Sequence, residues 1–205
     1  MLEVGPPFQN RIWDVPVRNQ FKPNVITGDL KQAFLQVRIR ECDRNSLQFH
    51  WVKDIITQEI QVLRFTRALF GLVQSPFILG ATIKHHLQNY KESHPKLVSD
   101  IEKELYVDDL IHGVYHVQDG THFKDQSTNI FDDANFTLHK WHSNIPSLEG
   151  DCGVPIPSQE NDDNTYAKQQ FKTNGTKEIR LLGIAWDKTK DTLIIKLPEL
   201  ERAAS

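Results

Sequence analysis

The sequence predicts an α+β fold in which a sheet is covered on one face by helices. Short runs of β-branched and other apolar residues are typical of strands, and they are interleaved with two longer segments whose apolar residues recur at helical spacing. The order of these segments is mixed, which is typical of α+β proteins.

Each predicted element has its own signal. Strands are expected where β-branched runs end at turn residues, and helices where a capping residue or a first-turn proline precedes spaced apolar positions. Ser75 and Pro76 start one helix in this way, and Thr121 caps the other. In order, the prediction is an irregular lead-in over 1–24, strands over 25–27, 46–52 and 60–65, a helix over 75–90, a hairpin over 104–114, a helix over 121–134, a strand over 136–141, a long polar loop over 144–177 and a last hairpin over 179–197.

Composition bounds the class of protein. The 205 residues are 39% hydrophobic and 25% charged, which suits one globular domain, or one domain and a fragment, and excludes collagenous, low-complexity and disulfide-stapled proteins. The formal charge of −3 excludes a protein whose whole surface binds nucleic acid. The charge is uneven, because residues 1–90 hold 11 Lys and Arg against 7 Asp and Glu, and residues 91–205 hold 13 against 20. A polyanion would therefore bind mainly to the first half.

No sequence segment predicts secretion or a membrane span. The N-terminus has neither the basic flank nor the apolar stretch of a signal peptide, and apolar runs such as residues 181–186 are too short to cross a bilayer. Cys42 and Cys152 fit no metal motif and are interpreted as reduced thiols, with one disulfide as the alternative. The sequence therefore predicts an intracellular protein with no membrane partner.

Adjacent aspartates occur three times, at 108–109, 132–133 and 162–163, so a pair alone decides nothing. The pair at 132–133 falls on the polar side of a predicted helix and the pair at 162–163 in the polar loop, where solvated side chains are expected. Asp108 and Asp109 differ because apolar strand residues flank them, although a surface turn is the alternative interpretation. Carboxylates at the tip of a buried hairpin repel one another and need a cation.

A further carboxylate, Asp29, ends the predicted strand over 25–27. If that strand lies beside the hairpin, Asp29 and Asp108 face each other across the sheet. Two carboxylates in one niche can hold two divalent cations about 3.5–4 Å apart, the arrangement used for in-line phosphoryl transfer. Oxygen ligands with room for water and phosphate favour Mg²⁺.

Five sequence words around these aspartates resemble the motifs of reverse transcriptases, in the same order. Residues 29–34 (DLKQAF) resemble motif A, 70–77 (FGLVQSPF) motif B, 106–109 (YVDD) motif C, 136–141 (FTLHKW) motif D and 181–186 (LLGIAW) motif E, the primer-grip hairpin. The phrases GDLKQAFLQVRI, LYVDDLIHG and LHKWHSN are most similar to the Pol polyproteins of Bel/Pao-type LTR retrotransposons. The resemblance spans residues 2–197, and five motifs in order make it specific.

The resemblance implies a polymerase palm with an antiparallel-type sheet and helices packed on one face. Residues 1–24 would be a lead-in left from the fingers, 25–144 the palm with motifs A to D, 145–177 a polar linker or long loop, and 178–205 the motif E hairpin and tail. In the family, fingers precede motif A and a thumb follows motif E, whereas here 28 residues precede Asp29 and the chain ends at Ser205. We therefore expect fingers and thumb to be largely missing, and little or no processive DNA synthesis by these 205 residues.

The resemblance also implies roles for single residues. Asp29 and Asp108 would bind two Mg²⁺ or Mn²⁺ ions, and Asp109 would complete the acidic cluster. Lys140 would lie near the pyrophosphate as a general acid. Phe34 would exclude a 2′-OH, with a place in the core as the alternative. The other implied substrate-binding residues shape the nucleotide and template pocket or place the primer terminus: Gly71, Gln74, Ser75, Pro76, Tyr106, Leu182 and Gly183.

The implied function is RNA-directed DNA polymerase, with nucleotidyl transfer to a primer 3′-OH. The implied partners are an RNA or DNA template with its primer, deoxyribonucleoside triphosphates and the remaining Pol domains. The expected location is the cytoplasm, within a particle if the element is active, with the nucleus as the alternative. Two other functions remain open. One is a palm without catalysis that only binds nucleic acid or protein. The other is an RNA-dependent RNA polymerase, which Phe34 and Tyr106 disfavour.

The remaining polar residues are interpreted more simply. The histidines, among them His139 and His142, lack the partners of a metal motif and are interpreted as surface or satisfied core residues. A set of arginines forms either a solvated face or contacts with template or triphosphate: Arg38, Arg40, Arg44, Arg64 and Arg67.

Overall fold

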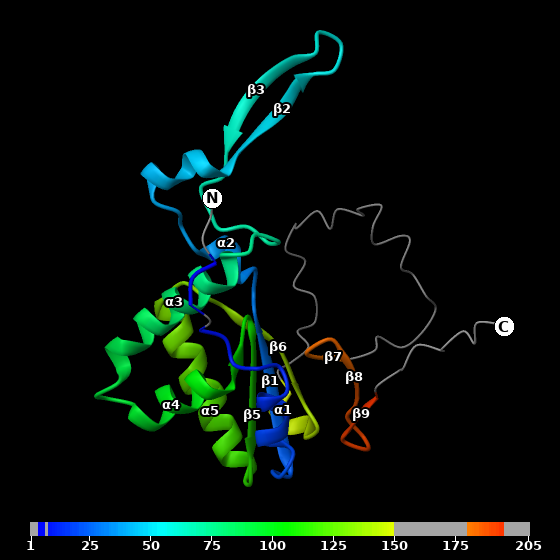
Figure 1. Ribbon diagram of the computed structural model, residues 1–205. Helices are drawn as coiled ribbons and strands as arrows, with labels where there is room; N and C mark the ends of the chain where they lie inside the picture. Colours follow the sequence, from blue (N-terminus) through cyan, green and yellow to red (C-terminus); the bar gives the residue numbers. More distant parts are fainter. Residues whose placement is uncertain (1–3, 7, 150–179, 195–205) are drawn as a thin grey trace, which may run out of the picture.

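A computed structural model of the chain describes residues 4–6, 8–149 and 180–194, and in them helices mix with antiparallel strands (Figure 1). The predicted α+β class is confirmed. The central sheet has four strands in the order β4-β5-β1-β6, and every pairing in it is antiparallel. Its strands are β1 (Asn24–Leu30), β4 (Leu105–Tyr106), β5 (Asp109–Val114) and β6 (Leu138–Ser143).

One face of the sheet is covered by three helices, α3 (Ser75–Leu87), α4 (Pro95–Glu104) and α5 (Val117–Asp133) (Figure 1). Alternate strand residues such as Ile26 and Leu110 point into this layer and are fully buried with apolar helix side chains. Burial of each such side chain contributes about 1.5–3 kcal/mol, so this layer is the main core.

The opposite face is also covered in part, which differs from the expectation of helices on one face only. Val25 of β1 and Ile111 of β5 point to this side, because strand residues alternate between faces. They form a second apolar cluster with Val15 of α1 (Asp14–Asn19), Leu181 of β7 (Arg180–Leu181) and Trp186 of β8 (Ile184–Asp187). The hairpin is completed by β9 (Thr192–Ile194).

A two-stranded hairpin projects away from the sheet (Figure 1). It pairs β2 (Gln48–Asp54) with β3 (Glu59–Arg64), which lie within two residues of the strands predicted over 46–52 and 60–65. Many of its apolar side chains are exposed on both faces, among them Trp51 and Ile60. The hairpin follows α2 (Ala33–Gln36) and the 3₁₀ helix η1 (Glu41–Leu47).

Several predicted bounds were wrong. The lead-in is not wholly irregular, because it contains α1, and α4 was not predicted at all. Thr121 is not a cap: α5 begins at Val117, and Gly120 is buried against Leu148, so packing rather than a hydroxyl cap defines the first turn. The predicted strand over 136–141 begins and ends two residues later, as β6. The remaining short helices are η2 (Gln88–Tyr90) and η3 (Pro146–Leu148).

The last hairpin turns through Leu182 and Gly183, whose φ values are +51° and +80°. Two left-handed residues between paired strands are typical of a type I′ turn. Most of the polar linker predicted over 145–177 lies outside the described residues. None of the helices in the described part of the chain is long and apolar enough to cross a membrane.

Candidate active site

Three carboxylates meet at the end of the central sheet nearest α2. Asp29 of β1 lies directly opposite Asp109 of β5, and Asp108 occupies the turn that precedes β5. Directly opposed residues on antiparallel strands point to the same face, with Cβ atoms about 4.5–5.5 Å apart. The structure therefore places Asp29 beside the hairpin tip, on the face that carries the second apolar cluster. Its direct partner is Asp109 rather than the predicted Asp108, because β5 begins one residue after Asp108.

The turn that presents Asp108 has an unusual backbone. Tyr106 pairs with Asp109, so only Val107 and Asp108 connect β4 to β5. Val107 has a φ of +56°, which is rare for a β-branched residue. The backbone N–H of Leu30 donates a hydrogen bond of 2.8 Å to the Asp108 carbonyl oxygen, which ties the turn to β1. Such left-handed conformations cost about 1–3 kcal/mol and cluster at functional sites.

The shared position of the carboxylates raises two of their pKa values. Burial, and then the negative charges of Asp108 and Asp29, raise the pKa of Asp109 to about 6. Burial and the charge of Asp29 also raise the pKa of Asp108. The Lys140 ammonium opposes both shifts. Burial therefore disfavours the charged forms of Asp108 and Asp109, the neighbouring negative charges add to this effect, and a nearby cation would oppose it.

Asp29 is contacted from β6 by two neighbouring side chains. His139 Nε2 donates a hydrogen bond of 2.6 Å to Asp29 Oδ2, and Lys140 Nζ lies 3.4 Å from the same oxygen. Lys140 has a φ of +50°, and the pairing of β1 with β6 shifts by one residue at this position, so a β-bulge occurs here. Bulges re-aim side chains, and this one brings two successive residues to the same carboxylate.

Gly28 permits this arrangement of β6. A Cβ atom at Gly28 would lie 2.9 Å from ring atoms of Trp141, which is closer than side chains can approach. The Trp141 ring lies over the backbone of β1 on the helical side, and Lys124 Nζ is 5.5 Å from its centroid. The glycine before Asp29 is therefore required by packing of β6 against β1.

The donor set fits Mg²⁺ or Mn²⁺ but does not form a complete cage. In the described residues, no three His, Cys, Asp or Glu side chains are placed to hold one metal ion together. Mg²⁺ is usually held by one or two carboxylates, with waters and substrate phosphates completing its shell. Asp29 and Asp108 are two such carboxylates at one end of the sheet, where the Leu30 N–H ties the Asp108 turn to β1.

The residues implied for the nucleotide pocket lie around the start of α3, which contacts α2. Gly71 has a φ of +81° and open space where a Cβ would lie. Gln74 and Ser75 are buried, and Pro76 lies in the first turn of α3. Phe34 is 6% exposed and packs edge-on to Phe70, with 4.7 Å between ring centroids. The ring is thus part of the main core, and its role as a gate stays a prediction.

The residues implied for the primer terminus lie on the other face of the sheet. Leu182 is partly buried against the second apolar cluster, and so is Tyr106, which the resemblance implies only as a substrate-binding residue. Gly183 lies in the turn of the β7–β8 hairpin. The structure therefore brings the predicted motif E hairpin against the strand that leads into the acidic pair.

Asp132 and Asp133, the other aspartate pair that the structure describes, do not join this cluster. Asp132 and Asp133 are at the end of α5, where Asp133 Oδ2 accepts a hydrogen bond of 2.8 Å from Tyr90 Oη. Asp162 and Asp163 lie outside the described residues.

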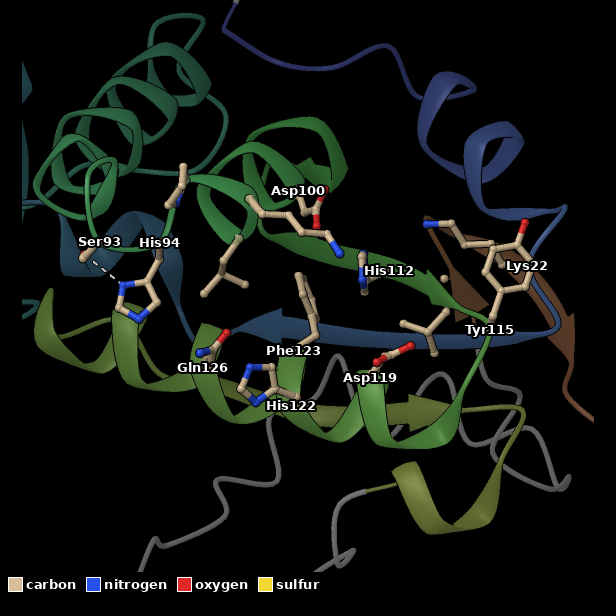
Figure 2. Close-up of a pocket in the computed structure, with 15 residues that line it drawn as sticks. Lys22, Ser93, His94, Asp100, His112, Tyr115, Asp119, His122, Phe123 and Gln126 are labelled. Atoms are coloured by element: carbon tan, nitrogen blue, oxygen red, sulfur yellow. Dashed lines mark hydrogen bonds between the residues drawn. The ribbon is translucent and has the colours of Figure 1, made fainter.

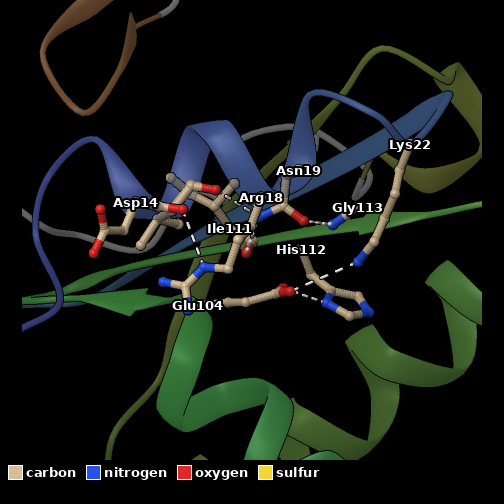
Figure 3. Close-up of polar contacts among 9 residues, drawn as sticks. Asp14, Arg18, Asn19, Lys22, Glu104, Ile111, His112 and Gly113 are labelled. Atoms are coloured by element: carbon tan, nitrogen blue, oxygen red, sulfur yellow. Dashed lines mark hydrogen bonds and ion pairs between the residues drawn. The ribbon is translucent and has the colours of Figure 1, made fainter.

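A second polar cluster lies at the opposite end of β5 (Figure 2). A cavity of about 660 Å³ is lined there by residues of α4, α5 and β5, including His112 and Phe123. Glu104 is buried, pairs with His112 and lies 3.7 Å from Lys22 Nζ (Figure 3). Asn19 Oδ1 accepts a hydrogen bond of 2.7 Å from the backbone N–H of Gly113. These contacts satisfy buried polar groups and hold α1 against β5.

Sequence reasoning missed two of these features. His139 was interpreted as a surface or satisfied core residue, yet it contacts Asp29. Its position beside Lys140 in a strand next to β1 was the only available signal. The pairing of Glu104 with His112 was also missed, although both lie within the predicted hairpin.

No known family model matches the chain, and a comparison with curated proteins finds no match either. A function must therefore be inferred from the residues of this chain and their placement. The carboxylate cluster is the feature that bears most directly on chemistry.

Proposed function

We propose that the chain is a reverse-transcriptase palm of the Bel/Pao retrotransposon type, an RNA-directed DNA polymerase that adds deoxynucleotides to a primer 3′-OH. One observation carries the proposal: Asp29 at the end of β1 lies opposite Asp109 at the start of β5 and next to the turn residue Asp108, and the three stand in motif order in the sequence. Two of these carboxylates have raised pKa values, which supports a cation-binding role.

The residues divide the chemistry between them. Two Mg²⁺ or Mn²⁺ ions, held by Asp29 and Asp108 with Asp109 beside them, would supply a Lewis acid for the phosphoryl oxygens and lower the pKa of the primer hydroxyl. The carboxylates would fix the positions of the two cations. Positioning and charge stabilisation of this kind account for most of the catalysis of phosphoryl transfer. The Lys140 side chain is 66% exposed, so its ammonium can turn toward a leaving pyrophosphate and donate a proton.

The partners follow from the same proposal. They are an RNA or DNA template with its primer, deoxyribonucleoside triphosphates and further Pol domains. Arginines at the base of the β2–β3 hairpin supply positive charge: Arg67 bonds the backbone oxygen of Gln36, and Arg64 lies 3.7 Å from Glu41. Contacts between these arginines and template phosphates would be sequence-independent and would weaken with salt.

Single-nucleotide addition tests the proposal without requiring processive synthesis. The purified chain is mixed with a primer on an RNA template, one complementary deoxynucleotide and Mn²⁺ or Mg²⁺, and products are separated by size. We expect slow addition of one nucleotide by the wild type and none by Asp108→Asn. Asp132→Asn, which removes an exposed carboxylate on α5, is the matched control and should behave as the wild type.

One observation favours a second candidate, a palm that binds nucleic acid or protein without catalysis. Asp29 Oδ2 already accepts a hydrogen bond from His139 and lies 3.4 Å from Lys140 Nζ, whose positive charge offsets part of its negative charge. Primer–template binding by the wild type, with no metal-dependent addition and no effect of Asp108→Asn, would favour this candidate over the polymerase.

A further inference from the structure

The hydrogen bond between His139 and Asp29 holds one particular oxygen of the carboxylate. Nε2 donates to Oδ2 at 2.6 Å, and the two side chains are 29% and 30% exposed. In the described part of the chain, Oδ2 receives both contacts to Asp29, and Oδ1 receives none. The bond therefore fixes the carboxylate and leaves one oxygen available.

The backbone of β6 places His139 at this point. His139 lies directly opposite Asp29 in the pairing of β6 with β1, and Leu138 lies opposite Leu30. The bulge follows immediately, at Lys140. Because His139 precedes the bulge, its register with Asp29 is set by regular pairing, and its side chain meets the carboxylate across the strand pair.

Residues that hold a metal-binding carboxylate by a hydrogen bond are common in metal sites. Such residues orient the ligand, and their loss lowers metal affinity by about 10–100-fold. Asp29 needs orientation because Asp109 lies directly opposite it and Asp108 is the next residue, so like charges share this end of the sheet. Without the imidazole, rotation of the carboxylate away from its neighbours would relieve that repulsion.

We propose that His139 is a positioning residue of the active site: it holds Asp29 Oδ2 and thereby presents Oδ1 as the oxygen that binds a divalent cation. This inference rests on the proposed function, since it assumes that Asp29 is a metal ligand. His139 touches neither substrate nor metal in this role.

Lys140 provides a contrast on the same oxygen. Its ammonium is more distant, at 3.4 Å from Oδ2, and its side chain is 66% exposed. A flexible surface ammonium acts on the site by charge rather than by geometry. The two neighbouring residues therefore have opposite effects on a bound cation, His139 favourable and Lys140 unfavourable.

Mn²⁺ binding to the full chain tests this directly, because free Mn²⁺ is measured by electron paramagnetic resonance without any turnover. We expect His139→Leu to weaken Mn²⁺ binding about 10-fold. His139→Gln should restore most of the affinity, since its amide can donate to the same oxygen. Lys140→Met should bind Mn²⁺ about 2–3-fold more tightly, because a nearby positive charge is removed. Thermal unfolding without metal establishes that each variant is folded.

Two results separate the failure of this inference from that of the proposed function. If the wild type binds Mn²⁺ and Asp108→Asn does not, but His139→Leu binds as the wild type does, the positioning role is wrong and the metal site remains. If the wild type does not bind Mn²⁺, or binds it equally well with Asp108→Asn, the proposed metal site itself is wrong. Equal losses in His139→Leu and His139→Gln would also contradict the role of the hydrogen bond.

Discussion

The central sheet carries an imidazole–carboxylate pair at each end, and the two pairs differ in what surrounds them. At one end Glu104 and His112 are buried, with side chains 8% and 11% exposed. At the other end Asp29 and His139 are 30% and 29% exposed. Each pair also has a lysine within 4 Å of its carboxylate, Lys22 or Lys140. At both ends, therefore, a carboxylate is contacted by one histidine and one lysine.

The neighbours of each pair make the difference. Around Glu104, charges of opposite sign balance, and Asn19 satisfies the adjacent strand end (Figure 3). Around Asp29, two further carboxylates, Asp108 and Asp109, add negative charge that Lys140 only partly offsets. Loss of one partner from a balanced and buried pair leaves the other partner uncompensated, which destabilises the fold. In an unbalanced and partly exposed cluster, like charges repel one another, and a ligand of opposite charge can relieve that repulsion.

The largest expected effect is on the balanced pair. Glu104→Ala leaves His112 and Lys22 without their carboxylate in a buried site, and we expect the free energy of unfolding to fall by about 3 kcal/mol. Asp29→Asn, which removes one of three repelling carboxylates, should change it by less than about 1 kcal/mol. Urea unfolding at neutral pH measures both. Equal losses in the two variants would show that the ends of the sheet do not differ as described.

The next effect concerns Gly28, the backbone position that allows β6 to pack closely against β1 beside Asp29. Gly28→Ala would place a Cβ atom 2.9 Å from the Trp141 ring, which is held in the main core. We expect a loss of about 1–3 kcal/mol in the free energy of unfolding, because overpacking displaces β6 from β1. Gly71→Ala is a useful control for added bulk, since a Cβ there meets open space, although its positive φ adds some strain of its own. A neutral result for Gly28→Ala would contradict the close approach of Trp141.

Sequence reasoning could place the acidic cluster because the signals were local and mutually consistent. A short apolar run that ends at Asp29 and an apolar hairpin around Asp108 both predict strands that finish in carboxylates. Pro76 likewise marked the start of α3 to within a residue or two. Each of these signals depends on residues that are adjacent in the chain.

The features that could not be predicted depend on contacts between distant segments or on the backbone. The bulge at Lys140 has no sequence signal, because its left-handed residue is not a glycine. The packing of α1 and the last hairpin on the second face depends on Val15 and Trp186, which are far apart in the sequence. In contrast, α4 had a usable signal, since Pro95 precedes Leu97 and Ile101 at helical spacing.

A smaller effect tests the repulsion among the carboxylates at the end of the sheet that carries Asp29, Asp108 and Asp109. Burial and neighbouring negative charge raise the pKa of Asp109 from 3.8 to about 6. Between these values the folded chain keeps a proton that the unfolded chain has lost, so stability falls as the pH rises and the full cost is present above about 6. The shift corresponds to at most about 3 kcal/mol, and solvent screening of this partly exposed group reduces it to about 1–2 kcal/mol.

Asp109→Asn removes this cost, so the variant should be more stable than the wild type at pH 8, by a few degrees in the unfolding temperature. The advantage should shrink as the pH falls through 6 and disappear near 4. Thermal unfolding across this range in a metal-free buffer measures the difference. A pH-independent advantage would mean that packing, rather than charge, makes Asn the more stable residue.

The smallest effect isolates the lysine at the site end. Lys140→Met removes the ammonium that lowers the pKa of Asp109, so that pKa should rise above about 6 in the variant. The free energy of unfolding should change by about 0.5 kcal/mol or less, because the side chain is 66% exposed and surface pairs contribute little. Carboxyl carbon resonances of Asp109, followed by NMR from pH 4 to pH 8, report the pKa directly, and Lys96→Met at the far end of the sheet is the control. An unchanged Asp109 pKa would mean that solvent already screens Lys140 from the aspartates. The ammonium would then not offset the negative charge of Asp29, Asp108 and Asp109.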